Sequence, residues 1–201
     1  MTLSEFATFP TGNYCNASPA VRPVDAAIKP LIPGKRIAGR ARTARVTPGQ
    51  NAAIHRAVHA AKPGDLLVVD GGGSMRFGPF GDLLADFCRM RELAGAVFDC
   101  TVRDSTDIAA LGFQIFARGY HPEATAKTEL GEIDVPVAVG GVLIAPSDIV
   151  VGDDDGVVVI PKANADEVLS KVARVAAGEE KIRARIRAGE STVDMFNIKQ
   201  P

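Results

Sequence analysis

The amino-acid sequence predicts an α/β fold built around a mixed sheet. Two short apolar runs bounded by glycine or proline, residues 65–70 and 95–100, are typical of buried strands. Apolar residues at helical spacing occur before and between these runs, over 50–61 and from Asp82 onward. Short β-rich pieces follow Phe113, so we expect an α/β half followed by a half that consists mainly of strands.

The N-terminal segment, about 1–34, contains five prolines, which leave room for only one or two short helices. Residues 36–46 alternate small or apolar residues with arginines and are expected to form a half-exposed strand. The next helix is indicated by apolar residues at helical spacing, namely Ile54, Ala57, Val58 and Ala61.

A glycine-rich loop follows the strand at 65–70, and Asp82 is the expected N-cap of the next helix. The strand at 95–100 leads into 101–107, which we expect to be a loop or a short helical turn. Both segments leave the carboxyl ends of strands. In open α/β sheets this edge is where ligands bind.

Four β-rich pieces are expected in the second half, the last of them with a turn at 154–156: residues 113–119, 133–140, 141–145 and 148–161. A long charged helix over about 164–188 follows. We find no internal repeat or low-complexity segment, and a chain of 201 residues can bury a single core. The sequence therefore predicts one domain over 1–201.

Composition excludes several classes of protein. A net charge of -1 with mixed charges gives no electrostatic footprint for nucleic acid. No apolar stretch approaches the roughly twenty residues of a membrane helix, and the N-terminus has no features of a signal peptide. Cys15, Cys88 and Cys100 lack metal-like spacing, and the last two are expected to be buried thiols. A cytoplasmic protein without nucleic-acid or membrane partners is expected.

Three acids and one arginine mark a candidate site: Asp82, then twenty residues, then Arg103 and Asp104, with Asp107 three residues further on. A hard divalent cation such as Mg²⁺ or Mn²⁺ prefers oxygen ligands, keeps several waters and needs only one or two protein carboxylates. We expect Asp104 to be the direct ligand, and Asp82 and Asp107 to hold metal-bound waters. Each residue alone would more often be an N-cap or a surface ion pair, and only their convergence favours a site.

Anion recognition is expected beside this metal. Arg103 has planar donors that can grip a carboxylate or an enolate oxygen, and the free amides of Leu83 and Leu84 form a helix N-terminus. A Schiff base would need a buried lysine near the site, and none lies between Lys62 and Lys127. The sequence thus favours metal-assisted chemistry on a small carboxylate.

Other candidate sites have simpler explanations. His55 and His59 have a zinc-compatible spacing, but a polar helix face is the favoured reading. His121 could support the site or shape a turn. Residues 153–155 fit a hairpin turn better than a calcium loop, and 71–73 do not form a dinucleotide fingerprint.

From about Lys35 to the C-terminal helix, the chain resembles the family that contains 4-hydroxy-4-methyl-2-oxoglutarate aldolase and the regulator of ribonuclease activity A (RraA). The resemblance is carried by PGDLLVVDGGGS, by the D-x20-R-D-x2-D spacing and by SDIVVGDDDGVVVIP. It implies a layered β/β/α, swivelling-domain-like fold. It also implies a pyruvate site with a divalent metal, formed by Gly81, Asp82, Leu83, Leu84, Arg103 and Asp104.

The resemblance further implies a homotrimer, or a hexamer built from trimers, with Glu179 or Glu180 reaching a neighbouring subunit's site. Regulatory members tend to lack the acid that stands here as Asp107, which favours the enzyme. Ser147 departs from the family, which usually has glycine there. The basic helix face of Lys181, Arg183, Arg185 and Arg187 is expected to be solvated or intersubunit.

Two functions remain open. The first is a metal-dependent lyase that cleaves 4-hydroxy-4-methyl-2-oxoglutarate or a related 4-hydroxy-2-oxo acid to pyruvate, with oxaloacetate decarboxylation as a second activity. The second is a non-catalytic regulator that binds a ribonuclease or another protein.

Overall fold

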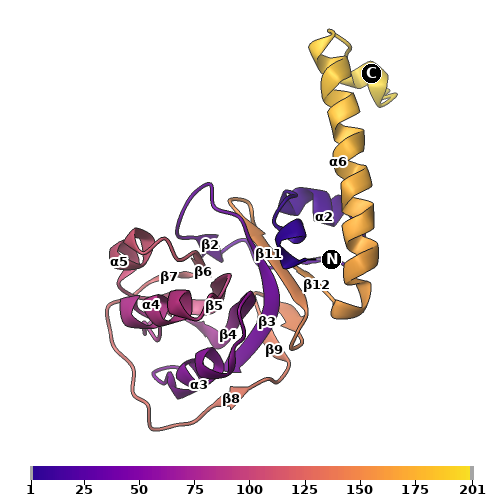
Figure 1. The fold of residues 1–201 in the computed structure, drawn as a ribbon. Helices are drawn as coiled ribbons and strands as arrows, with labels where there is room; N and C mark the ends of the chain where they lie inside the picture. Colours follow the sequence, from indigo (N-terminus) through magenta and orange to yellow (C-terminus); the bar gives the residue numbers. More distant parts are fainter. Residues whose placement is uncertain (1, 200–201) are drawn as a thin grey trace.

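The computed structural model describes residues 2–199 and has a mixed central sheet with a long C-terminal helix (Figure 1). The strands are β1 (Arg22–Pro23), β2 (Lys29–Pro30), β3 (Ile37–Arg45), β4 (Asp65–Ser74), β5 (Gly95–Val102), β6 (Ile115–Ala117), β7 (Gly119–Tyr120), β8 (Glu132–Ile133), β9 (Val137–Val139), β10 (Val142–Ile144), β11 (Ile149–Asp153) and β12 (Gly156–Ile160). The helices are α1 (Leu3–Phe6), α2 (Thr11–Ala17), α3 (Ala52–Ala60), α4 (Asp82–Met90), α5 (Ser105–Ala110), α6 (Ala165–Arg187) and α7 (Thr192–Met195).

The sheet runs in the order β1-β12-β11-β3-β4-β5-β6-β2, with β8 beside β3 and β7 beside β5. Strands β3, β4, β5 and β6 pair in parallel, whereas β11, β12, β1 and β2 pair antiparallel to their neighbours. This mixture confirms the predicted fold class. The parallel strands end at one edge of the sheet, and the loops that leave them gather there.

Strand β4 shows how the layers form, because all of its apolar side chains are buried. Leu67 and Val69 belong to the core under α3, α4 and α5, while Leu66 and Val68 belong to the core under the β9–β10 hairpin. Successive side chains of a strand point to opposite faces. The sheet is therefore covered by helices on one face and by a second, two-stranded sheet on the other, as the layered β/β/α prediction requires.

A third core joins the N-terminal helices to α6 over strands β11 and β12. The hydroxyl of Tyr14 donates a hydrogen bond to the Phe6 carbonyl oxygen at 2.7 Å. Thr11 donates from both its backbone N–H and its hydroxyl to the buried carboxylate of Asp153, at 2.8 and 2.7 Å. The aspartates at 153–155 thus close a hairpin and anchor α2.

Only the first half of α6 packs on the body, where it lies beside α2, and its second half projects away (Figure 1). Three arginines on the projecting part are paired along the chain: Arg183 with Glu179, Arg187 with Glu180, and Arg185 with Glu190. All of these pairs are exposed, so each contributes little to stability.

Three details differ from the sequence-based expectations. Gly81, not Asp82, occupies the N-cap position of α4, and Asp82 is the first helical residue. Strand β5 continues to Val102, so only two residues separate it from α5. Ser147 adopts a left-handed backbone conformation, with φ 71°, which suits the glycine usual in the resembled family better than serine.

Among residues 2–199, none of the helices combines the length and apolar character needed to cross a bilayer.

The cysteines are expected to react with thiol reagents to very different extents. Cys88 and Cys100 are buried, and burial raises the pKa of each thiol to about 12, while Cys15 is exposed. Because the thiolate is the nucleophile, one thiol per folded chain should react with a disulfide reagent, against three in denaturant. Cys15→Ser should abolish the reaction of the folded chain. Rapid labelling of two or three thiols without denaturant would contradict this assignment.

Candidate active site

The loop before α4 and the end of β5 are tied together by backbone contacts. The Arg103 N–H donates to the Phe80 carbonyl oxygen at 2.9 Å. Gly81 is extended and leads directly into α4, so the first helical amides lie beside the end of β5. The first amides of a helix have no partner within the helix and favour anions.

Asp104 lies at the centre of this arrangement. Its carboxylate oxygen Oδ2 accepts from Arg103 Nε at 3.1 Å and lies 3.4 Å from the Asp82 backbone nitrogen. Asp104 occupies the N-cap position of α5, yet its side chain makes no capping bond, and its backbone is left-handed with φ 54°. An N-cap aspartate normally accepts from its own helix. Both departures hold the carboxylate toward the loop before α4, and such local strain is typical of functional sites.

Two glycines allow this close approach. A Cβ atom on Gly81 would overlap Asp104 Oδ2 and lie 3.0 Å from Arg103 Nε. A Cβ atom on Gly78 would lie 2.7 Å from Arg103 Cβ and would also collide with the His121 carbonyl oxygen. The glycine-rich loop is therefore shaped by the packing of Arg103 and Asp104 against it.

A cleft of about 150 Å³ opens beside these residues. It is lined by Asn51 and His55 of α3, Gly78, Pro79 and Gly81 of the glycine-rich loop, Asp82, Leu83 and Leu84 of α4, Arg103, and Ala124, Thr125 and Lys127 of the following loop. The predicted anion-binding residues thus share one cleft with residues far away in sequence.

Asp104 and Asp107 open onto different hollows. Asp104 and Arg103 line one hollow with Tyr120 and His121, whereas Asp107 lines another with Asp82. Asp82 and Arg103 therefore connect the cleft to its two neighbours. Within residues 2–199, no three His, Cys, Asp or Glu side chains are close enough to hold a metal ion together. A divalent cation here could contact only one or two protein carboxylates and would need water for its other ligands, a mode common for Mg²⁺.

Three residues of the cleft were not predicted as site residues: Asn51, His55 and Lys127. Asn51 and His55 are four residues apart and so share one face of α3. Partial burial and the positive charge of Lys127 lower the pKa of His55, which keeps the imidazole neutral at neutral pH. Lys127, which ends the lysine-free stretch after Lys62, is brought to the cleft by the loop after β7. No sequence periodicity signals such a loop.

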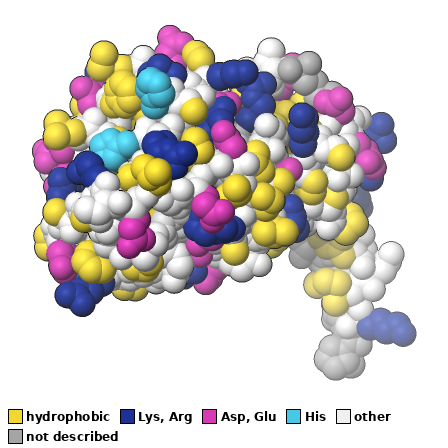
Figure 2. Space-filling view, turned by 90° about the horizontal axis from the view of Figure 1, so that it is seen from below, with side chains coloured by type: hydrophobic (Ala, Val, Ile, Leu, Met, Phe, Trp, Pro, Cys, Tyr) yellow, Lys and Arg dark blue, Asp and Glu magenta, His cyan; other side chains and the backbone are white. Residues whose placement is uncertain are grey.

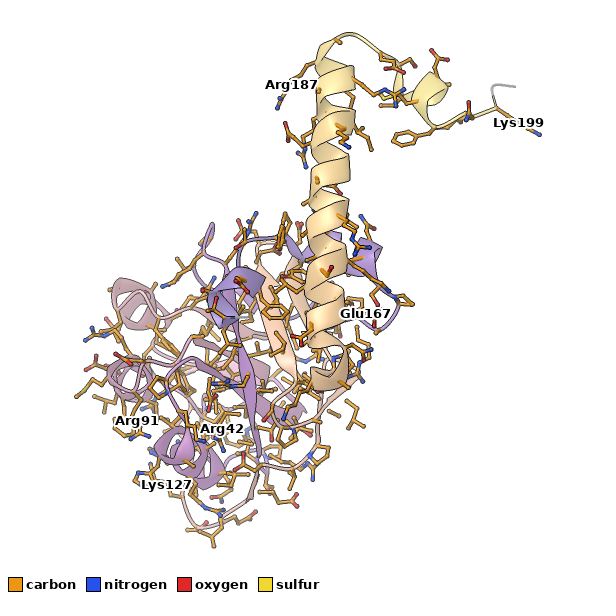
Figure 3. All side chains as sticks on the ribbon, turned by 45° about the vertical axis from the view of Figure 1, so that its right-hand side comes forward. Arg42, Arg91, Lys127, Glu167, Arg187 and Lys199 are labelled. Atoms are coloured by element: carbon orange, nitrogen blue, oxygen red, sulfur yellow. The ribbon has the colours of Figure 1, made fainter. Side chains whose placement is uncertain are left out.

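Two views show how charged side chains are distributed over the molecule (Figures 2 and 3). Seen from the end of the molecule where α3 lies, histidine and basic side chains are close neighbours (Figure 2). Lys127 lies at the end of the body opposite to Arg187 (Figure 3).

Glu179, eight residues before Arg187 on α6, pairs with Arg183 in this chain. Its predicted role in a neighbouring subunit's site stays a prediction.

His121 is held close to the site. Its backbone N–H donates to the Val102 carbonyl oxygen at 2.9 Å, and its Nδ1 accepts from the Glu123 N–H at 3.2 Å. The side chain lines the hollow that contains Arg103 and Asp104. It therefore shapes a turn and borders the site at once.

The chain belongs to the RraA-like family, since the family model described as Aldolase/RraA matches residues 13–159. It is 39% identical over 186 residues to a protein of Halalkalibacterium halodurans provisionally named 4-hydroxy-4-methyl-2-oxoglutarate aldolase, covering 92% of this chain and 87% of that protein. A protein from Aromatoleum aromaticum with the same provisional name is 34% identical over 152 residues, covering 75% of this chain and 95% of that protein.

Solved structures share the fold. RraAS2 from Streptomyces coelicolor, described as an unusual member of the RNase ES inhibitor RraA family, matches with a TM-score of 0.79 and 31% identity, covering 90% of this chain and 94% of that chain. The RNA-processing inhibitor RraA from Thermus thermophilus matches with a TM-score of 0.71 and 30% identity, covering 77% and 93%. The family thus contains proteins named for two different activities.

Gly78→Ala should destabilise the protein, because the new Cβ would lie 2.5 Å from the backbone carbonyl oxygen of His121 and 2.7 Å from the Cβ atom of Arg103. We expect a loss of about 1–3 kcal/mol in the free energy of unfolding, measured by urea denaturation. Gly178→Ala in α6 is the matched control: nothing lies near its added methyl, and alanine should stabilise the helix by up to about 1 kcal/mol. Equal stability of Gly78→Ala and the wild type would show that the close approach is not constrained.

Proposed function

We propose that this protein is a divalent-metal-dependent aldolase that cleaves 4-hydroxy-4-methyl-2-oxoglutarate, or a related 4-hydroxy-2-oxo acid, to pyruvate. Oxaloacetate decarboxylation is proposed as a second activity, because it leaves the same pyruvate enolate. The observation that carries the proposal is the Asp104 carboxylate, held in a strained backbone beside Arg103 and the first amides of α4. The family membership and the names of its aldolase relatives support it.

The residues present fit a divalent cation. Oδ2 of Asp104 contacts Arg103 and the Asp82 amide, while no residue of 2–199 hydrogen-bonds Oδ1. Asp104 is about one-third exposed, so water can complete a coordination shell. When bound, Mg²⁺ or Mn²⁺ supplies Lewis-acid polarisation of the 2-oxo group. Asp82 and Asp107, which line one hollow together, would support such an ion through water.

The protein groups would divide the remaining work. The amides of Leu83 and Leu84 bind the substrate carboxylate and orient the bond that breaks. Arg103 places positive charge where the enolate oxygen develops. A water held by Asp82 or Asp107 removes the hydroxyl proton. The cleft also contains His55, whose lowered pKa favours the neutral imidazole, a base that the motif itself does not contain.

A regulatory role is the second candidate, supported by the likeness to solved RNase-inhibitor RraA structures. A regulator would act through its surface and would not need the carboxylate of Asp104. Assays of pyruvate release therefore separate the two functions.

We also propose that the protein is cytoplasmic, consists of one domain and assembles as a trimer or hexamer. In this assembly Glu179 would reach the site of a neighbouring subunit.

Pyruvate release from 4-hydroxy-4-methyl-2-oxoglutarate and from oxaloacetate should require Mg²⁺ or Mn²⁺ and stop after chelation. Asp104→Asn should abolish metal binding, measured by calorimetry or by Mn²⁺ paramagnetic resonance. Asp107→Asn should weaken metal affinity or rate by about 10- to 100-fold, as changes around a metal's water shell do. Asp166→Asn on exposed α6 serves as the control. Full activity after exhaustive chelation would refute the metal requirement.

Arg103→Lys should lower kcat far more than it lowers stability. Lysine keeps the charge but not the planar donors that reach an enolate oxygen. If Arg103 acts like an oxyanion donor, the loss is about 2–4 kcal/mol of transition-state stabilisation, measured as kcat/KM. Thermal unfolding of the variant monitors the fold. Near-normal turnover, or trapping of a covalent pyruvate adduct by borohydride, would show that this mechanism is wrong.

A further inference from the structure

His121 has one ring nitrogen that is bound by the backbone and one that is not bound. Its Nδ1 atom accepts a hydrogen bond from the Glu123 backbone N–H at 3.2 Å. Because a backbone N–H can only donate, Nδ1 carries no proton in this arrangement, and the proton of the neutral imidazole lies on Nε2. Among residues 2–199, no group accepts a hydrogen bond from Nε2. The side chain is therefore a donor with a fixed tautomer and no partner.

The sheet brings His121 to the level of Arg103. Strand β7 pairs in parallel with β5, with Val102 opposite Tyr120, and the His121 N–H donates to the Val102 carbonyl oxygen at 2.9 Å. His121 and Arg103 each follow the last residue of their strand, so they lie side by side at one edge. A hollow of about 260 Å³ is lined by both residues together with Asp104 and Tyr120. His121 is only half-buried, so a ligand in this hollow can reach it.

This hollow borders the reacting end of the candidate site. Asp104, the proposed metal ligand, lines this hollow and does not line the cleft of about 150 Å³, whereas Arg103 lines both. A 2-oxo group that is polarised at Asp104 and bound by Arg103 therefore has its oxygen beside the hollow that contains His121. An N–H donor in this place stabilises the negative charge that develops on such an oxygen.

We propose that His121 is a catalytic residue that donates a hydrogen bond from Nε2–H to the developing enolate oxygen. A neutral imidazole can act as an electrophile of this kind. When the C3–C4 bond breaks, its electron pair is delocalised onto the enolate oxygen, and the Nε2 proton stays on the ring. His121 is thus not the base, since Nε2 already carries a proton. The inference rests on the proposed function, because that reaction supplies the enolate.

Two variants separate this role from the role of His121 in the turn. His121→Asn keeps an acceptor where Nδ1 stands and has no donor at the position of Nε2. His121→Gln places an N–H near the position of Nε2 and leaves the Glu123 N–H without its acceptor. His59→Asn, which changes an exposed histidine of α3 outside the cleft and the hollow, is the matched control.

His121→Asn should lower kcat/KM for pyruvate release about 10- to 100-fold, the effect of one hydrogen bond to a charged group. His121→Gln should keep most of the activity, and the control should match the wild type. Oxalate, a planar dianion that resembles the enolate of pyruvate, should bind to His121→Asn more weakly by a similar factor, measured by calorimetry. Binding of pyruvate itself should change less, because its 2-oxo oxygen carries no full charge.

A further measurement uses the wild-type protein labelled with ¹⁵N-histidine. The Nε2–H signal that is missing from His121→Gln should move downfield when oxalate binds. An unmoved signal, wild-type oxalate binding by His121→Asn, or a loss in His121→Gln as large as that in His121→Asn would each overturn the proposal. If the wild-type protein releases no pyruvate, the proposed function itself is refuted, and this inference falls with it.

Discussion

The parallel pairing of β4 with β5 is the constraint on which the rest of the molecule depends. Both strands are apolar and buried on both faces, so they must lie at the centre of a covered sheet. Their pairing from Leu66 with Gly95 to Val69 with Phe98 sets the level at which each strand ends. The glycine-rich loop and the Arg103–Asp104 turn meet because both leave that edge. Helices on one face and the β9–β10 hairpin on the other then complete the burial.

Two helices of the candidate site begin at a residue that could cap the helix with its side chain but does not. Asn51 and Asp104 occupy N-cap positions with residue types that suit them, yet neither caps its helix. Each side chain reaches across to the loop before α4 instead. A missing cap costs about 1 kcal/mol. Two such losses beside the same loop are more consistent with selection for binding than with selection for stability.

Much of the fold could be predicted from the sequence, because strands β4 and β5 and helices α3 and α6 have clear periodicity and clear ends. The meeting of Asp82 with Arg103 and Asp104 followed from the rule that ligand sites lie at the carboxyl edge of such a sheet. The N-cap of α4 was predicted one residue too late, because aspartate is the better cap by type. Gly81 takes the N-cap position instead, because the residue that approaches the Asp104 carboxylate must lack a Cβ atom.

The cleft residues outside the motif could not be predicted in this way. Lys127 reaches the cleft through a loop without helical or strand periodicity, and His55 looked like part of an ordinary polar helix face. Only the fold shows that both residues line one cleft. Asn51 could have been suspected as an N-cap, but nothing in the sequence indicates that its oxygen is left without a partner.

The loop that carries Lys127 is joined to the body by few backbone bonds: Gly78 to Glu123, Ala126 to Gly49 and Asn51 to Ala126. The buried strands that support Arg103 and Asp104 do not depend on its side chains. Substitutions along this loop can therefore accumulate without unfolding the sheet. The half of the cleft formed by this loop is therefore free to diverge between relatives, whereas the half formed by Arg103 and Asp104 is held by the core. An ancestral protein of this architecture could thus acquire new substrates and keep its chemistry.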